Sequence, residues 1–380
     1  MADFLRQLPD GGVEGANKPS IWQRIHIDPL LLVVVYLIFG AGIFVLISAS
    51  ENSLAYAKRQ MVFAGLGTIV MIIVAQIPPS FLRRWVWPVY LFGIALLVVV
   101  MFFGDGAKGA QRWIDLGFIS FQPSEVMKLA LPTAVAAYLS HQALPPTLGR
   151  IAISLALVVV PVGLVLKQPD LGTALLVAVS GLVVLFLAGL RWRYMIFAGL
   201  IAMIALPLMW IFLMYDYQRQ RVLTMFNPEA DKLGAGWNII QSKTAIGSGG
   251  WSGKGWLGGT QSHLDFLPEG HTDFIIAVLA EEFGMRGVLL LLLLYFLFVV
   301  RGFWISLKAK SSFGRMLAGA ITFTLFIYVF VNMGMVSGIL PVVGVPLPLV
   351  SYGGTSLLSL FMSFGVLMAI STETQKLADD

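Results

Sequence analysis

The sequence predicts an all-α polytopic membrane protein with about ten transmembrane helices, and three observations support this class. The 380 residues are 58% hydrophobic and only 12% charged, whereas a soluble domain carries roughly 25% charged residues. The mean hydropathy is +0.86. Apolar runs long enough to cross a bilayer recur from one end of the chain to the other.

Ten apolar runs approach the length of about twenty residues that a spanning helix needs. The fifth and sixth runs are the least clearly separated, because only the stretch KQPD lies between them. The predicted spans are 29–48, 60–77, 86–103, 125–140, 151–167, 172–189, 194–215, 273–300, 316–338 and 347–370.

Lysine and arginine are distributed unequally between the two sets of short connections. Cytoplasmic loops are enriched in these residues, so we expect both termini in the cytoplasm. With that orientation the inner side holds Arg6, Lys18, Arg24, Arg83, Arg84, Arg150, Arg191, Arg193, Arg301, Lys308, Lys310, Arg315 and Lys376, and the short outer loops hold Lys58, Arg59, Lys108, Arg112 and Lys167.

The chain is expected to form one membrane domain, residues 29–371, between cytoplasmic tails at residues 1–28 and 372–380. The N-terminus does not resemble a cleavable signal, because a long stretch of mixed polarity precedes an apolar run of full spanning length. The absence of cysteine excludes disulfides and thiol chemistry. No dense basic patch interleaved with aromatic residues occurs, so nucleic-acid binding is not predicted.

Two outer loops are longer than packing requires, residues 104–124 and about 216–272. Long loops in compact proteins are functional or disordered. Aromatic residues such as Trp237, Trp251 and Trp256 run through the second loop and disfavour disorder. We therefore expect the chemistry of this protein to face outward.

The stretch FLPEGHTDF places Glu269, His271 and Asp273 immediately before an apolar helix. Thr272 is a predicted N-cap, and an acid in the first helical turn is stabilised by the helix dipole without any catalytic role. That reading does not explain why two further titratable groups share the same edge, so a functional carboxylate at the membrane face is the alternative. The role of Glu281, which lies about 12 Å deeper along the helix, stays open.

Two more ionisable features lie at the outer ends of predicted spans. Glu125 and Lys128 are three residues apart and therefore share a helix face. They form either an internal salt bridge or a ligand contact, and both alternatives imply a polar interior. Asp170 is either a first-turn acid that suits the helix dipole or a second carboxylate near Asp273.

The glycine-rich stretch GSGGWSGKGWLGG lacks the strand and βαβ context of a dinucleotide site. Its glycines serve either tight turns or a close backbone approach to a phosphate, with Lys243 and Lys254 nearby. The segment GILPVVGVPLPLVSYGG has irregular backbone at membrane depth, which survives only inside protein or beside a wet cavity, so it is expected to wall a groove. The histidines show no metal-ligand spacing.

These motifs resemble the SEDS family (shape, elongation, division and sporulation), on its elongation branch rather than its division branch. The resemblance covers nearly the whole chain after the N-terminal tail. It is carried by GAQRWIDLGFISFQPSEVMKLA, KQPDLGTA, GWNIIQSKTAIGSGGWSGKGWLGGTQSHLDFLPEGHTDFIIAVLAEEFG and GILPVVGVPLPLVSYGGTS.

The resemblance implies a ten-span peptidoglycan glycosyltransferase of the bacterial inner membrane with its active site facing the periplasm. Its substrate would be lipid II, and its partners a class B penicillin-binding protein transpeptidase, membrane lipid and the elongation machinery. The family's essential acid matches Asp273. Other family positions match Glu125, Lys128, Asp170, Arg112 and Trp113.

The sequence supports a mechanism in which Asp273 takes the proton of an acceptor hydroxyl. A helix N-terminus favours the ionised carboxylate and so makes it a weak base, which burial or Glu269 would offset. The alternative is that Asp273 binds a divalent cation, Mg²⁺ or Mn²⁺, that neutralises the diphosphate; no cofactor is certain. Expected substrate contacts also include His271, and diphosphate contacts would come from Arg112, Lys128, Arg219, Arg221, Lys243 and Lys254.

Two other classes of function remain open from the sequence. A lipid II flippase would use the intramembrane charges to line a translocation path. A non-catalytic scaffold would hold a transpeptidase and would not depend on Asp273.

Overall fold

The computed structural model describes residues 21–50, 53–107, 110–115, 120–141, 144–212, 214–231, 234–263 and 269–376. Most of the predicted N-terminal tail and the end of the predicted C-terminal tail lie outside these residues.

Ten long helices in the described part of the chain match the ten predicted spans. Eight of them are long and apolar enough to cross a membrane, α7 is apolar but has 17 residues, and α5 carries the ionisable pair of Glu125 and Lys128. The ten are α2 (Pro29–Ala49), α3 (Leu54–Ala75), α4 (Pro79–Phe103), α5 (Pro123–Ser140), α6 (Leu148–Lys167), α7 (Leu171–Leu187), α8 (Trp192–Phe212), α12 (Ile275–Lys308), α13 (Ser312–Val336) and α14 (Gly354–Lys376).

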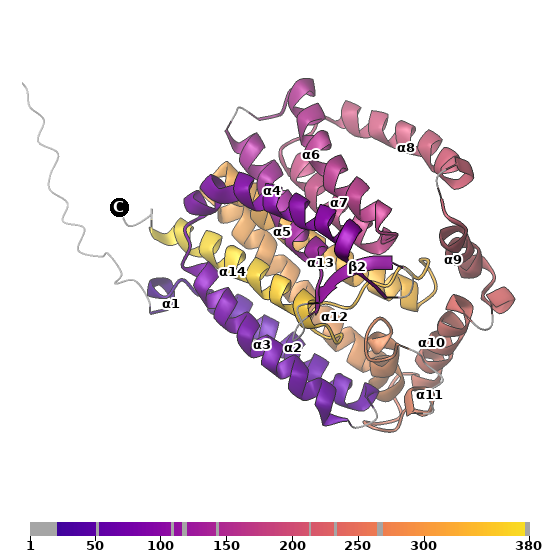
Figure 1. Ribbon diagram of the computed structural model, residues 1–380. Coiled ribbons are helices and arrows are strands. Elements are labelled where there is room, and N and C mark those ends of the chain that lie inside the picture. The colour runs from indigo at the N-terminus through magenta and orange to yellow at the C-terminus, as the bar shows by residue number, and fades with distance from the viewer. Residues whose placement is uncertain are drawn as a thin grey trace, which may run out of the picture.

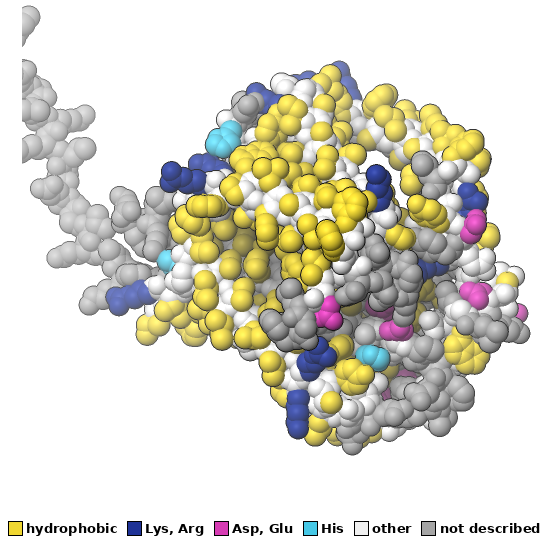
Figure 2. All heavy atoms as spheres, in the orientation of Figure 1, with side chains coloured by type: hydrophobic (Ala, Val, Ile, Leu, Met, Phe, Trp, Pro, Cys, Tyr) yellow, Lys and Arg dark blue, Asp and Glu magenta, His cyan; other side chains and the backbone are white. Residues whose placement is uncertain are grey.

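The helices form a bundle in which segments far apart in sequence lie side by side (Figure 1). α14 packs along α3, α2 packs along α12, and α13 contacts both α7 and α12. α8 differs from the other spans, because its apolar window has no residue buried within the chain and it lies at the edge of the bundle in Figure 1. Hydrophobic side chains cover the middle of the face in Figure 2, and the visible carboxylates gather toward the end nearer α9–α11.

The all-α prediction needs one addition, a small antiparallel sheet in the predicted loop 104–124. Its strands are β1 (Asp105–Ala107), β2 (Ala110–Asp115) and β3 (Ser120–Phe121), in the order β1-β2-β3. The predicted loop 216–272 contains helices of its own. The short elements are α1 (Ile21–Arg24), α9 (Asp216–Phe226), the 3₁₀ helix η1 (Pro228–Asp231), α10 (Ala235–Gly249) and α11 (Thr260–His263).

Some predicted helix starts are wrong, and α3 and α4 begin at residues 54 and 79 rather than at 60 and 86. The last span was expected from residue 347, but α14 begins at Gly354 and the preceding residues form turns that include Leu349 at φ +66°. The N-cap of α12 is Phe274 rather than Thr272. The hydroxyl of Thr272 instead donates to Oε2 of Glu269 at 2.9 Å, within the turn that precedes the helix.

α12 is broken at Gly284, where φ is +66° and ψ is −163°. The turn after α10 fills the break with backbone hydrogen bonds. Inside a bilayer every backbone polar group needs a partner. This turn supplies the hydrogen-bond partners that the broken helix lacks. The bonds run from Lys254 N to Glu281 O (3.0 Å), from Gly255 N to Glu282 O (2.9 Å) and from Met285 N to Gly250 O (3.0 Å).

The side chain of Glu281 strengthens the same junction and so has a structural role. Its Oε1 accepts hydrogen bonds from Lys254 Nζ (2.7 Å) and from the backbone N–H groups of Thr260 (2.8 Å) and Gln261 (3.0 Å). The first part of α12, which follows Asp273 directly, is therefore fixed to the segment 250–261.

We predict that Gly249→Ala separates α10 from α12. A Cβ at Gly249 would lie 2.0 Å from the carbonyl oxygen of Ala280, and overpacking of this kind costs about 1–3 kcal/mol. The unfolding temperature of the purified protein in detergent should therefore fall.

Gly247→Ala is the matched control, because no atom lies within 4 Å of a Cβ at this position in the same helix. Its unfolding temperature should stay equal or rise, since alanine exceeds glycine in helix propensity by about 1 kcal/mol. Equal unfolding temperatures for the two variants would contradict the packing described.

Candidate active site

A cavity of about 660 Å³ lies beside the N-terminal end of α12. Its walls come from α5, α7, α9, α10, α13, strand β2 and the segment 342–356. Segments from residue 112 to residue 356 therefore meet here. Seven predicted site residues line the cavity, namely Asp273, Glu125, Lys128, Arg112, Trp113, Asp170 and Glu269.

Asp273 lies in the turn 269–274, just before α12. The turn is closed by hydrogen bonds from Thr272 N (3.1 Å) and Phe274 N (3.2 Å) to the carbonyl oxygen of Glu269. Phe274 is buried behind the turn. A Cβ at Gly344 would lie 3.5 Å from Oδ2 of Asp273, so the carboxylate faces a backbone segment that carries no side chain at this point.

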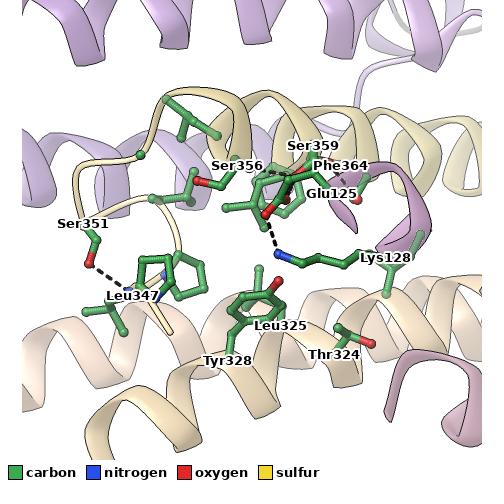
Figure 3. A pocket seen from close by; sticks show the side chains of 18 residues that line it. Glu125, Lys128, Thr324, Leu325, Tyr328, Leu347, Ser351, Ser356, Ser359 and Phe364 are labelled. Carbon is green, nitrogen blue, oxygen red and sulfur yellow. Dashed lines mark hydrogen bonds and ion pairs between the residues drawn. The ribbon is translucent and has the colours of Figure 1, made fainter. Parts of the chain in front are cut away.

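Glu125 and Lys128 form the ion pair that their spacing predicts, with 2.5 Å between Lys128 Nζ and Glu125 Oε1. Ser359 Oγ donates to the other carboxylate oxygen at 2.6 Å, and Lys128 Nζ lies 5.1 Å from the centre of the Tyr328 ring. Figure 3 shows Lys128 pointing toward Glu125 above Tyr328. Glu125, Tyr328 and Ser359 also line a smaller chamber of about 60 Å³ between α5, α13 and α14.

Arg112 and Asp170 form a second ion pair, at 3.7 Å between Arg112 Nε and Asp170 Oδ2. Arg112 Nη2 donates to the carbonyl oxygen of Pro169 at 2.6 Å, so β2 is fastened to the start of α7. Asp170 is the N-cap of α7, because its Oδ1 accepts from Thr173 N at 3.1 Å. Asp170 is therefore the residue before the first turn of α7 rather than an acid within it, and it lines the same cavity as Asp273.

Three predicted site residues are not among the residues that line this cavity. Lys254 is bound to Glu281, as described above. Lys243 is exposed, and its side chain lies beside Gly338. His271 packs its ring 5.1 Å from that of Tyr56 and 6.4 Å from that of Tyr352. The glycine-rich turn thus serves helix packing, and its predicted phosphate contact has no counterpart in this cavity.

Other cavity residues had little or no signal in the sequence. Arg221 was one of several candidate cations, and α9 brings it to the cavity, whereas Arg219 donates to the carbonyl of Trp210 at the end of α8. Tyr328 lies within an apolar span, where nothing distinguishes it from a packing residue. The remaining polar residues that were not predicted for the site are Gln122, Thr173, Asn238, Thr272, Tyr352 and Ser356.

The cavity combines four carboxylates with three cations, and two of the cations are paired with carboxylates. No group of three His, Cys, Asp or Glu among the described residues could hold a metal ion. A divalent cation here would need further oxygen ligands from a substrate, which is a common arrangement for Mg²⁺ with phosphates.

Comparisons with known proteins agree on one family. The chain is 51% identical to the peptidoglycan glycosyltransferase MrdB of Escherichia coli K12 (96% of this chain, 99% of MrdB). It is 36% identical to the stage V sporulation protein E of Bacillus subtilis 168 (90% and 96%).

Solved structures show the same fold. A chain of a peptidoglycan synthase complex that coordinates polymerization and crosslinking matches with a TM-score of 0.81 at 32% identity (91% of this chain, 98% of that chain). The rod-shape-determining protein RodA of Thermus thermophilus matches with a TM-score of 0.69 at 31% identity (90% and 96%). The FtsW/RodA/SpoVE family model, described as "Cell cycle protein", matches residues 25–376. The chain belongs to the FtsW/RodA/SpoVE family.

Proposed function

We propose that Asp273 is the general base of the glycosyl transfer that this protein catalyses. The protein is a peptidoglycan glycosyltransferase. It joins lipid II disaccharide-pentapeptide units into glycan strands during lateral cell-wall elongation and rod-shape maintenance, and it releases undecaprenyl diphosphate.

In the reaction, the 4-hydroxyl of an acceptor sugar attacks the anomeric carbon of a sugar diphosphate. The bond to the diphosphate breaks as the new glycosidic bond forms, with inversion, and Asp273 takes the hydroxyl proton. Proton transfer to a positioned side chain contributes typically about 10²–10⁴-fold in rate. The observation that carries this role is the place of Asp273, which lines the large cavity opposite the bare backbone of Gly344.

The cations of the cavity are the proposed ligands of the diphosphate leaving group. A guanidinium has five N–H donors, and the bonds from Arg112 to described residues use only Nε and Nη2. Arg221 reaches the cavity from another wall. Lys128 is held by Glu125, so it supplies charge at a fixed position on the cavity wall.

The distribution of Lys and Arg supports one orientation of the protein in the membrane. Arg301 lies near the end of α12 far from Asp273, where it binds the buried Asp28 with 2.6 Å between Nη2 and Oδ2, and Lys308 follows at the end of the helix. By the positive-inside rule we propose that this end is cytoplasmic, with both termini, and that the cavity faces the periplasm. Residues 29–371 would form one membrane domain.

A class B penicillin-binding protein that crosslinks the new strand is the partner in this function. The matching synthase complex, in which polymerization and crosslinking are coordinated, supports such a partner. Membrane lipid and the elongation machinery complete the expected surroundings.

We predict that Asp273→Asn abolishes polymerisation. The amide is nearly isosteric but cannot take a proton, so no polymer should form from labelled lipid II in the presence of the transpeptidase. Asp216→Asn is the matched control, since this exposed carboxylate on α9 pairs only loosely with Arg219 at 3.5 Å, and it should polymerise like wild type. Polymer from a folded Asp273→Asn would exclude the base role, and no polymer from wild type would favour a flippase or a scaffold.

We predict that Gly344→Ala lowers kcat. Gly344 has φ +72°, a conformation that costs an alanine roughly 1 kcal/mol, and the added methyl would stand 3.5 Å from the carboxylate of Asp273. Gly189→Ala is the control, because Gly189 has φ +84° and a Cβ there would meet only Pro145, at 3.8 Å. Equal polymerisation rates for the two variants would show that the space beside Asp273 does not matter.

We predict that polymerisation by the purified complex persists after chelation of divalent cations, because a carboxylate base needs no metal. The measurement is the initial rate with EDTA, with and without added Mg²⁺ or Mn²⁺. A rate that falls with EDTA and returns with Mg²⁺ or Mn²⁺ would favour the alternative in which Asp273 binds a cation beside the diphosphate.

A further inference from the structure

The turn that carries Asp273 is held from outside its own helix. Three consecutive carbonyl oxygens in this turn accept hydrogen bonds from two other parts of the chain, the helix α13 and the segment before α14. The bonds come from Tyr352 N to His271 O (3.0 Å), from Ser351 Oγ to Thr272 O (2.5 Å) and from Asn332 Nδ2 to Asp273 O (2.9 Å).

Asn332 makes the contact closest to the proposed base, and it reaches the opposite wall as well. Its amide nitrogen also donates to the carbonyl oxygen of Val345 at 2.7 Å, next to Gly344, which faces the carboxylate of Asp273. One amide group therefore sets the separation between the carboxylate and the backbone segment opposite it.

Among the described residues, the side chain of Asn332 is held in its buried position by hydrogen bonds only through the two donors of its amide. The residue is fully buried near the C-terminal end of the apolar helix α13, and its Oδ1 has no hydrogen-bond partner among the described residues. A buried polar atom without a partner is unfavourable for folding. Only the two donor contacts of Asn332 offset that loss, and both act on the walls of the active-site cavity.

Asn332 is not among the residues that line the cavity. It therefore acts on the reaction through Asp273 and Val345 rather than by touching substrate. A displacement of a reacting group by about 1 Å can lower a rate on the order of 10²-fold, which is the scale on which a lost tether would act.

We propose that Asn332 is a positioning residue, which holds the backbone of Asp273 against Val345 so that the carboxylate meets the acceptor hydroxyl. This inference rests on the proposed base role of Asp273. It adds a residue of α13, 59 positions away in sequence, to the machinery of the reaction.

The test compares initial polymerisation rates of the full chain with its transpeptidase over a range of lipid II concentrations. Asn332→Leu removes both donors, and kcat should fall by about 10²-fold. KM for lipid II should stay within about threefold, because the residues that hold the diphosphate are unchanged. A merely structural role would not produce this separation of kcat from KM.

Two companion variants keep the result interpretable. Asn332→Ala also removes both donors and adds neither bulk nor charge, so it should show the same fall in kcat and decides the question if the leucine variant does not fold. Thr322→Val is the matched control on α13. Among the described residues its buried hydroxyl bonds only to the carbonyl oxygen of Ala318 in the same helix, so kcat should stay at the wild-type value.

Asp273→Asn, measured beside the Asn332 variants, separates the base role of Asp273 from the positioning role of Asn332. If it is inactive while folded Asn332→Leu and Asn332→Ala keep the wild-type kcat, the positioning role is wrong and the base role stands. If Asp273→Asn polymerises normally, both fail. A fall in kcat for Thr322→Val equal to that of the Asn332 variants would also overturn the positioning role.

Discussion

The need to satisfy every backbone polar group at membrane depth underlies the active end of this protein. The chain leaves helical geometry at the break of α12 and in the turn that carries Asp273. In both places the partners come from distant segments, the turn after α10 and the groups supplied by α13 and the segment before α14. The acid is thus placed by tertiary contacts on both sides, which gives it a fixed position beside the cavity.

The charges inside the helical bundle divide into those that join segments and those that face the cavity. Asp28 with Arg301 and Glu281 with Lys254 join segments, and in each pair the carboxylate is the more deeply buried partner. Breaking such a buried pair leaves an uncompensated charge, so these contacts limit relative movement of the helices. Asp273 differs, because its carboxylate lines open space, where a proton acceptor can meet a substrate.

Much of the fold and part of the site could be predicted from sequence. The ten spans follow from hydrophobic length, and the ion pair of Glu125 with Lys128 follows from their spacing on one helix. Lys254 shows the limit of prediction from sequence. A lysine in a glycine-rich turn could bind a phosphate or an acidic side chain, and only the contact with Glu281 in the structure reveals which of these it does. Asn332 and Tyr328 carry no signal at all, since a single polar residue in an apolar helix does not reveal what it faces.

The sequence by itself determined that the chain crosses a membrane many times and which acids stand at the ends of its spans, because hydrophobic length and charge placement are local properties. Only the tertiary structure decided which acids and cations share one cavity and where α12 and α14 begin. Those outcomes depend on hydrogen bonds between residues as far apart as Asp273 and Asn332. Such partners are chosen by the packing of helices in space, which no stretch of neighbouring residues records.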